Sequence, residues 1–173
     1  MDAFLAIASK RDTRRFADRP IPDDVTRRIL DAGRLAGSAR NAQPWRLLVV
    51  ENRERLKRLA TAVYVPDNVR GARLVVAIAG ERPFDLGRCA KNMLLAAWNE
   101  GVASCPNGIA DAEAAKEALG LDEPPAIVLT FGYPARHPGA ESRSAEEWSG
   151  RAERRTLDDV VTRLRRSSPA GAT

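Results

Sequence analysis

Two side-chain amides stand close together in the stretch Asn41-Ala42-Gln43-Pro44-Trp45. The stretch follows a segment with helical apolar spacing and precedes an apolar run, so we expect a corner between a helix and a strand. Because a proline favours extended backbone at the preceding residue, Gln43 should be extended and both amides should point outward. Such amides can recognise a polar, planar ligand. A plain turn closed by a buried Trp45 fits the same residues.

A basic stretch near the N-terminus is the second candidate site. It runs Lys10-Arg11-Asp12-Thr13-Arg14-Arg15-Phe16. Like charges at this spacing repel one another, and a bound anion would relieve the repulsion. Arginine also forms the bidentate hydrogen bonds that suit phosphate. A solvated charged surface is the alternative that these residues leave open.

Composition excludes several classes of protein. The chain has 173 residues, of which 44% are hydrophobic, and fits one ordinary domain. Its net charge of +5 permits nucleic-acid binding, but only 5% of residues are aromatic and the acidic residues are interspersed. The single histidine and two cysteines argue against a His-rich metal site or a disulfide framework and suit a reducing cytoplasm. No apolar run is long enough to span a membrane. We therefore expect neither a nucleic-acid partner nor a membrane partner, and the sequence offers no triad, carboxylate pair or metal cluster.

The corner and three other segments together resemble the flavin-dependent nitroreductase family. The basic stretch is similar to that family's opening motif, Arg-Arg-Ser-x-Arg-x-Phe, and Asn41-x-Gln43-Pro44-Trp45 is similar to its signature loop. Residues 92–97, with Gly101 and Ser104, resemble its central helix, and residues 154–161 resemble its closing segment. The four segments occur in the family's order. Two positions differ: Asp12 stands where the family usually has Ser, and Gly37 where it usually has Pro.

This resemblance implies an α+β, nitroreductase-like fold with a central mixed sheet of about four strands flanked by helices. A long central helix would lie at the interface of a homodimer, with the flavin sites between subunits. The implied cofactor is FMN, and NADH or NADPH would be the co-substrate. A hydride would pass through flavin N5 to an electron-poor acceptor such as a nitroaromatic or a quinone. No side chain is then required as a catalytic residue, because the flavin carries the chemistry.

The resemblance also assigns cofactor-binding residues. Lys10, Asp12 and Arg14 match positions that face the flavin phosphate, with Arg154 opposite, so we expect Arg14 and Arg154 to converge on one anion. A carboxylate beside a phosphate is repulsive, so Asp12 should orient Arg14 or cap the backbone. Gly108 should permit a backbone amide to approach N5, although a turn glycine would look the same. The full set is Lys10, Arg11, Asp12, Arg14, Gly37, Ser38, Ala39, Asn41, Gln43, Pro106, Asn107, Gly108, Arg154 and Arg155.

The elements that must position these residues follow from local signals. One domain is expected over residues 1–165, with a disordered tail over 166–173. Helices are expected after Asp2, after Asp23 or Asp24, over 53–63, from Asp85 to Glu100, after Asp111, and from a capping box of Thr156 and Asp159 through Leu164. Strands are expected over 47–50, 74–79 and 126–131, with a strand or turn over 102–105. Loops are expected over 64–71, where Asn68 would be solvated, and over 106–108. A longer loop is expected over 137–153, either as an arm on a partner subunit or as a mobile segment.

Three rival functions remain open. Some relatives of the fold cleave the flavin in an oxygen-dependent reaction, and their opening motif also carries Asp after two basic residues, as Asp12 does here. A flavin-binding module without turnover would show the same binding residues. A nucleic-acid-binding protein is the rival from another class, suggested by the excess of arginine and lysine.

Overall fold

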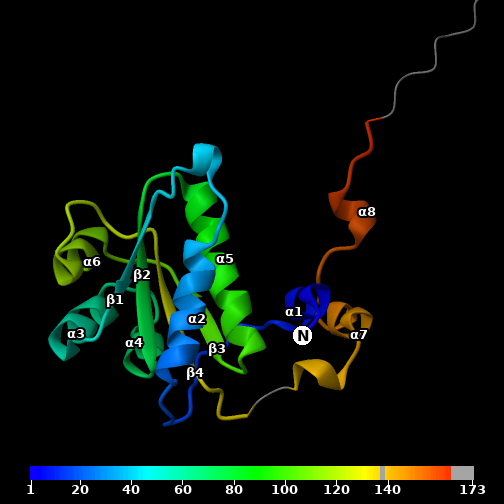
Figure 1. Ribbon diagram of the computed structural model, residues 1–173, viewed down its shortest axis with the longest axis horizontal. Helices are drawn as coiled ribbons and strands as arrows, with labels where there is room; N and C mark the ends of the chain where they lie inside the picture. The colour runs from blue at the N-terminus through cyan, green and yellow to red at the C-terminus, as the bar shows by residue number, and fades with distance from the viewer. Residues whose placement is uncertain (137–138, 165–173) are drawn as a thin grey trace, which may run out of the picture.

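The computed structural model describes residues 1–136 and 139–164, and its centre is a four-stranded sheet with the order β1-β2-β4-β3 (Figure 1). The neighbouring strands are all antiparallel. The expectation of an α+β fold with four strands is confirmed, but the sheet is antiparallel rather than mixed; a parallel pairing occurs at the isolated bridge between Asp12 and Ser104. The strands are β1 (Trp45–Val49), β2 (Leu74–Gly80), β3 (Ala103–Asn107) and β4 (Ile127–Gly132).

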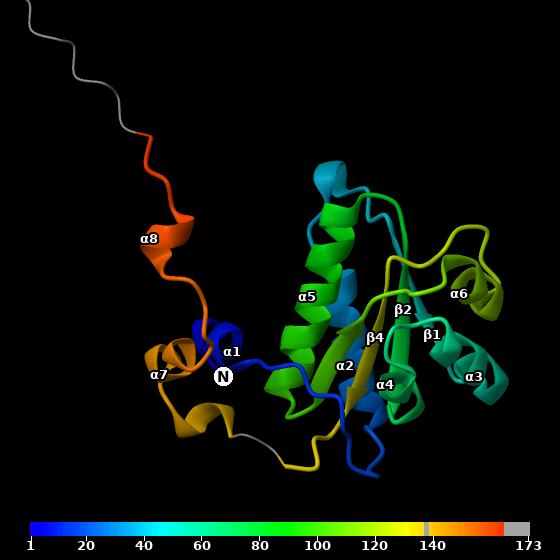
Figure 2. The ribbon, with the colours of Figure 1, turned by 180° about the vertical axis from the view of Figure 1, so that it is seen from behind.

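Helices cover both faces of the sheet (Figures 1 and 2). Along β2, Val76 and Ile78 belong to one hydrophobic cluster, whereas Val75 and Ala77 belong to another. Successive strand residues point to opposite faces, so this nearly continuous apolar run supplies both layers of core. The first layer consists of α2 (Asp23–Arg34) and α5 (Pro83–Asn99), and the second of α3 (Arg53–Thr61), α4 (Pro66–Arg70) and α6 (Ala112–Leu119).

The pairing of α2 with α5 depends on a glycine. A Cβ on Gly33 would lie 2.8 Å from Met93 Cγ and 3.2 Å from Cys89 Sγ, so a side chain at this position would collide with α5. The predicted stripe of α2 is buried at Val25 and Ile29. Close contact between the two helices makes α5 the central helix of the body, as the sequence predicts.

Two short helices form a separate pair beside the body. Helix α1 (Ala3–Ser9) begins at Asp2, whose carboxylate accepts hydrogen bonds from two backbone N–H groups, as predicted. It packs against α7 (Ala145–Gly150), which follows the short 3₁₀ turn η2 (Ala140–Ser142). The predicted loop over 137–153 is therefore partly helical, because Ser144 and Glu147 form a capping box. Residues 137–138 lie outside the described part.

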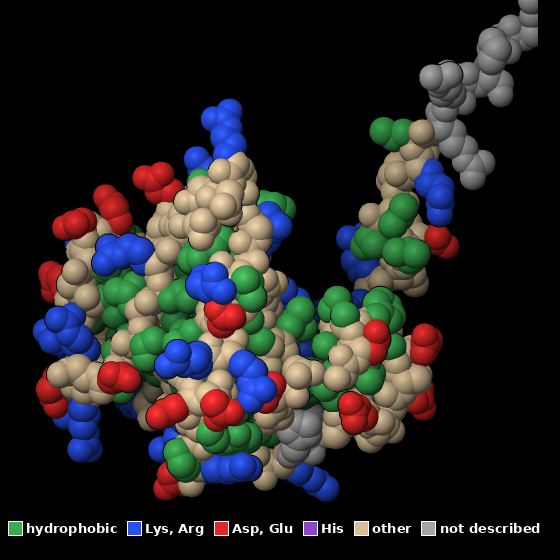
Figure 3. Space-filling model, in the orientation of Figure 1, with side chains coloured by type: hydrophobic (Ala, Val, Ile, Leu, Met, Phe, Trp, Pro, Cys, Tyr) green, Lys and Arg blue, Asp and Glu red, His purple; other side chains and the backbone are tan. Residues whose placement is uncertain are grey.

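An arm leaves α7 and extends away from the body (Figures 1 and 2). The predicted capping box of Thr156 and Asp159 begins α8 (Leu157–Val160), but the helix ends at Val160 rather than continuing to Leu164. The apolar side chains of the arm face solvent (Figure 3): Leu157 in α8 is 73% exposed, and Leu164 beyond the helix is 94% exposed. The expected tail over 166–173 lies outside the described residues. Within the described residues, no helix has both the length and the apolarity that crossing a bilayer requires.

Three further expectations about the elements are wrong. The strand expected over 47–50 begins earlier and ends earlier, at Trp45 and Val49, and it lies at the sheet edge, where Val49 is 37% exposed. The predicted loop over 64–71 contains α4, which begins at Pro66, a residue suited to a first helical turn. The predicted loop over 106–108 is shorter, because β3 continues to Asn107.

Candidate functional site

The amide corner lies at the N-terminal end of α5 and contains the 3₁₀ turn η1 (Ala39–Asn41) (Figure 1). Its backbone is left-handed at Arg40, Asn41 and Gln43, with φ of 56°, 54° and 47°. The expectation of an extended Gln43 is therefore wrong. Its N–H instead closes the corner by donating to Ser38 Oγ at 2.8 Å. Left-handed backbone costs L-residues roughly 1–2 kcal/mol each, so neighbouring contacts must hold it.

The side chains of the corner divide into two groups. Asn41 and Gln43 are exposed, and Gln43 Nε2 donates to Asn41 O at 3.4 Å. Ser38 accepts the Gln43 N–H with its hydroxyl and the Asn41 N–H with its carbonyl, so both oxygens are used inside the corner. Trp45 is half-buried against the core and anchors the exit of the corner, as expected. The corner therefore presents two exposed amides on a bent backbone.

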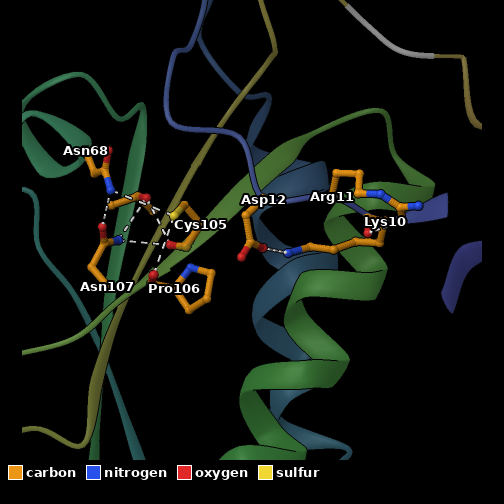
Figure 4. A network of polar contacts seen from close by, with 8 residues as sticks. Lys10, Arg11, Asp12, Asn68, Cys105, Pro106 and Asn107 are labelled. Atoms are coloured by element: carbon orange, nitrogen blue, oxygen red, sulfur yellow. Dashed lines mark hydrogen bonds and ion pairs between the residues drawn. The ribbon is translucent and has the colours of Figure 1, made fainter. Parts of the chain in front are cut away.

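The basic stretch places its charged side chains on two sides (Figure 4). Lys10 Nζ pairs with Asp12 Oδ1, and the Lys10 side chain is 6% exposed against 49% for Asp12. The sequence predicts that Asp12 orients Arg14 or caps the backbone. In the structure, the ion partner of Asp12 is Lys10. Arg11 points the other way and donates to Ala8 O at 2.6 Å and to Trp148 O at 2.9 Å. Arg11 thus joins α1 to α7 instead of facing Asp12.

A further lysine belongs to this charged group. Burial lowers the pKa of Lys91 on α5, the nearby Lys10 lowers it further, and Asp12 opposes the shift. Burial raises the pKa of the Cys105 thiol and Asp12 adds to the rise, while Arg14 and Lys10 oppose it. Lys10, Asp12, Arg14 and Lys91 therefore share one electrostatic environment. Sequence reasoning missed Lys91, although it immediately precedes the central-helix motif at Asn92.

A buried hydroxyl lies beside the same group. Thr13 N–H donates to Ser104 O at 3.0 Å, and Asp12 pairs with Ser104 in the isolated bridge. Ser104 Oγ is fully buried and has no hydrogen-bond partner among the described residues. Buried polar atoms are almost always paired, so this hydroxyl is an exception within the described part of the chain.

The end of β3 is held from behind by buried amides (Figure 4). Asn107 Nδ2 donates to Cys105 O at 2.9 Å, and Asn107 Oδ1 accepts from Asn68 Nδ2 at 2.7 Å. The Asn107 side chain therefore points into the protein, and only its backbone remains available to a cofactor. Asn68 is 3% exposed, so the expectation that it is solvated is wrong. Pro106 is half-buried in the same strand.

Gly108 follows this strand and lies against an aromatic ring. A Cβ on Gly108 would come within 3.2 Å of Tyr64 Cδ2, and Tyr64 N–H donates to Gly108 O at 3.3 Å. Tyr64 itself is 74% exposed. The glycine thus allows the Tyr64 ring to lie close to the backbone that the sequence predicts to face the flavin.

The C-terminal arginines do not join the site within one protomer. Arg154 and Arg155 lie at the start of the arm, which runs away from the body in both views (Figures 1 and 2). Arg155 Nη2 donates to Asp159 O and so stabilises α8. The expected convergence of Arg14 and Arg154 inside one polypeptide is therefore not found, because no described contact folds the arm back.

The two remaining groups lie toward opposite ends of α5 (Figure 1). The corner meets the first turn of the helix, where Ala39 N–H donates to Asp85 Oδ2. The stretch from Lys10 to Asp12 crosses near the other end, where Trp98 Nε1 donates to Ser9 Oγ at 2.9 Å. Along the axis of α5, Lys91 and Trp98 lie about 9 Å and about 20 Å from Asp85, so one protomer presents the corner and the cationic group as two separate half-sites.

Comparisons with known proteins give a consistent result. The chain matches the family described as "Nitroreductase family" over residues 7–76 and 77–133. It is 32% identical over 149 residues to a protein of Archaeoglobus fulgidus named "Putative NADH dehydrogenase/NAD(P)H nitroreductase", covering 77% of this chain and 86% of the relative. A protein of Methanothermobacter thermautotrophicus with the same name is 29% identical over 154 residues, covering 80% and 81% of the two chains. The crystal structure of "a putative nitroreductase in complex with fmn" from Desulfovibrio desulfuricans superposes with a TM-score of 0.79 at 27% identity, covering 95% of this chain and 98% of that one.

Proposed function

The chain belongs to the nitroreductase family, and from this premise we propose that it is an FMN-dependent oxidoreductase that uses NADH or NADPH to reduce an electron-poor acceptor such as a nitroaromatic or a quinone. The structural neighbour named as an FMN complex supports the cofactor. The names of the two archaeal relatives support the co-substrate. Both cysteines are free and buried, which is compatible with the cytoplasmic location that we propose.

The charged group around Ser104 is the observation that carries the proposal. Lys10, Arg14 and Lys91 would neutralise the FMN phosphate by charge-assisted hydrogen bonds. Asp12 keeps Lys10 in place through their ion pair, which gives this carboxylate a positioning role beside the anion.

The corner and the end of β3 would hold the ring of the flavin. Asn41 and Gln43 carry exposed amides that can bond its polar edge. The backbone N–H groups of Asn107 and Gly108 would be the donors at the reactive edge, where developing negative charge needs them, because Pro106 has none. Bound FMN would pass two electrons and one proton, as hydride, from NAD(P)H, and with a further proton reduce a quinone to a hydroquinone or a nitro group to a nitroso group and water.

A homodimer would complete the site. The half-sites of one protomer lie apart along α5, and the arm exposes Leu157, Val160, Val161 and Leu164. Helix α1 also exposes Phe4, which is 61% accessible. Apolar side chains at this density are typical of surfaces that a second copy covers. We propose that the corner of one protomer meets the cationic group of its partner, and that the partner's arm brings its arginines to the phosphate.

The experiment is an absorbance spectrum of the purified protein with added FMN, followed by anaerobic titration with NADH and then NADPH. We expect bound flavin and loss of its visible absorbance with one of the nucleotides. A double variant, Lys10→Gln with Arg14→Gln, should take up less FMN. The matched control, Arg34→Gln with Arg70→Gln, removes two surface cations that pair with Asp31 and Asp67 and should bind normally.

Each contrary outcome has a distinct meaning. Protein that stays colourless and takes up no FMN would refute the proposal. Bound FMN that neither nucleotide reduces would indicate a binding module without turnover. A second candidate, oxygen-dependent cleavage of FMN, is favoured by the half-exposed Asp12 carboxylate and would show as destruction of free FMN in air.

A further inference from the structure

The first turn of α5 holds one residue of the corner, Ala39, through both of its backbone polar groups. Ala39 N–H donates to Asp85 Oδ2 at 3.4 Å, and Ala39 O accepts from Arg82 Nη1 at 3.3 Å. The Asp85 side chain is only 6% exposed. Both distances are at the long end of the hydrogen-bond range, so neither contact is strong alone, but together they restrain the two peptide groups on either side of Ala39.

The connector before α5 also presses on the corner. A Cβ on Gly80, where φ is +137°, would lie 1.9 Å from Pro44 O, so the backbone of this connector lies directly against the exit of the corner. Arg82, two residues later, is the N-cap of α5 and has a left-handed φ of 63°. The left-handed residues on both sides of this contact, Arg82 and Arg40, indicate that the two segments hold each other in place.

A third arginine occupies the space that Gly37 leaves free. A Cβ on Gly37 would come within 2.4 Å of Arg88 Nη2. The guanidinium lies 3.7 Å from Asp85 Oδ1 and 5.9 Å from the centre of the Phe84 ring. A side chain at position 37 would require the half-exposed Arg88 guanidinium to move away from its place. The Gly37 departure from the family motif and the presence of Arg88 are therefore physically coupled.

We propose that Arg82, Asp85 and Arg88 are positioning residues, which we call the corner latch, and that they hold the left-handed backbone of residues 38–43 in the shape that binds the flavin ring. Left-handed backbone at Arg40 and Asn41 persists only when its surroundings impose it. A loop held in its bound shape before the ligand arrives loses less entropy on binding. The inference rests on the proposed function for its ligand, but the latch itself exists without the flavin.

The first test compares two substitutions of Asp85. Asp85→Leu has a similar size and removes the acceptor of the Ala39 N–H, whereas Asp85→Asn keeps an oxygen acceptor. In FMN-free protein, backbone amide exchange at residues 38–43 should be about tenfold faster in Asp85→Leu and nearly unchanged in Asp85→Asn. In a fluorescence titration, FMN should bind about tenfold more weakly to Asp85→Leu alone. Glu81→Gln, at an exposed carboxylate of the same connector, is the control.

The second test uses the steric coupling and does not depend on Asp85→Leu folding. Gly37→Ala should weaken FMN binding, because its methyl group displaces Arg88, and should speed exchange in the corner. Arg88→Ala alone should have the same effects, and the double variant should be no worse than either single variant, because both changes remove the same guanidinium contact.

The latch is overturned if Asp85→Leu is folded and exchanges at residues 38–43 like the wild type, or if Arg88→Ala leaves both exchange in the corner and FMN binding unchanged. If the wild-type protein binds no FMN, the proposed function is refuted. The amide-exchange measurement on FMN-free protein still tests the latch in that case.

Discussion

Replacing Asn107 by Ala tests whether the buried amides at the end of β3 stabilise the fold. The Asn107 Nδ2 atom donates to Cys105 O at 2.9 Å, to Thr130 Oγ1 at 3.1 Å and to Val128 O at 3.2 Å. The Oδ1 atom accepts from Asn68 Nδ2 at 2.7 Å. In the variant, Thr130 Oγ1 still donates to Cys105 O, whereas Asn68 Nδ2 loses its acceptor, Asn107 Oδ1.

The magnitude follows from the groups left unpaired. A buried polar group without a partner costs about 1–3 kcal/mol, and here the Asn68 amide and the Val128 carbonyl both lose a bond. Thr130 also loses a donor, and a small cavity adds to the cost. We expect the free energy of unfolding to fall by about 3 kcal/mol. With a urea m-value of about 2 kcal/mol/M, the midpoint should fall by about 1.5 M.

The assay is urea unfolding followed by circular dichroism at one fixed protein concentration, because dimerisation would make stability depend on concentration. Asn99→Ala, at an exposed position of α5, is the control and should change stability by less than about 0.5 kcal/mol. In a double-mutant cycle with Asn68→Ala, the combined loss should be smaller than the sum by about 1 kcal/mol. A loss below about 1 kcal/mol for Asn107→Ala, or strict additivity, would show that this reasoning about paired buried amides is wrong.

Three other predictions concern charge, pH and assembly. Arg14→Gln should weaken FMN binding about tenfold in a fluorescence titration, and wild-type affinity should fall as ionic strength rises. Burial raises the pKa of the Cys89 thiol to about 11, so the folded state binds this proton more tightly than the unfolded state, whose thiol pKa is about 8.5. The urea concentration at the unfolding midpoint should therefore fall as the pH rises from about 8.5 toward about 11. In native protein near neutral pH, Cys89 should resist alkylation, which would be detected by mass spectrometry. Leu157→Asp with Leu164→Asp should shift sedimentation toward the monomer, and unchanged sedimentation would remove the arm from the proposed interface.

Helix ends could be predicted from the sequence where the signal is local. Asp111 N-caps α6 through a 3.0 Å bond to the Ala114 N–H, and Gly120 ends the helix with a φ of 67°. Asp2 similarly begins α1. Each signal acts within four residues of its own position and needs no tertiary contact, which is why it survives folding. The apolar runs of β2 and β4 were equally informative, because burial on both faces suits an uninterrupted run.

Asp85 shows where such local reasoning fails. As a polar residue near a helix start it has the features of an N-cap, yet α5 begins at Pro83 and the carboxylate binds Ala39, 46 positions away in the chain. Asn68 likewise looks like a loop residue until its partner at Asn107 is known. Arg11 belongs to the basic motif, but its guanidinium joins two helices. The side-chain types could be identified from the sequence, whereas the partners depend on the fold.

If the proposed homodimer forms, the separation of the two half-sites along α5 has a genetic consequence. A subunit with a damaged corner and a subunit with a damaged cationic group would each be inactive as a pure dimer. Co-expressed in one cell, they would form mixed dimers in which one of the two pockets is built entirely from undamaged parts. Random pairing makes half of all dimers mixed, so about one pocket in four would work. Two null alleles of this gene should therefore complement each other when their lesions lie at opposite ends of that helix, and fail to do so when both lie at the same end.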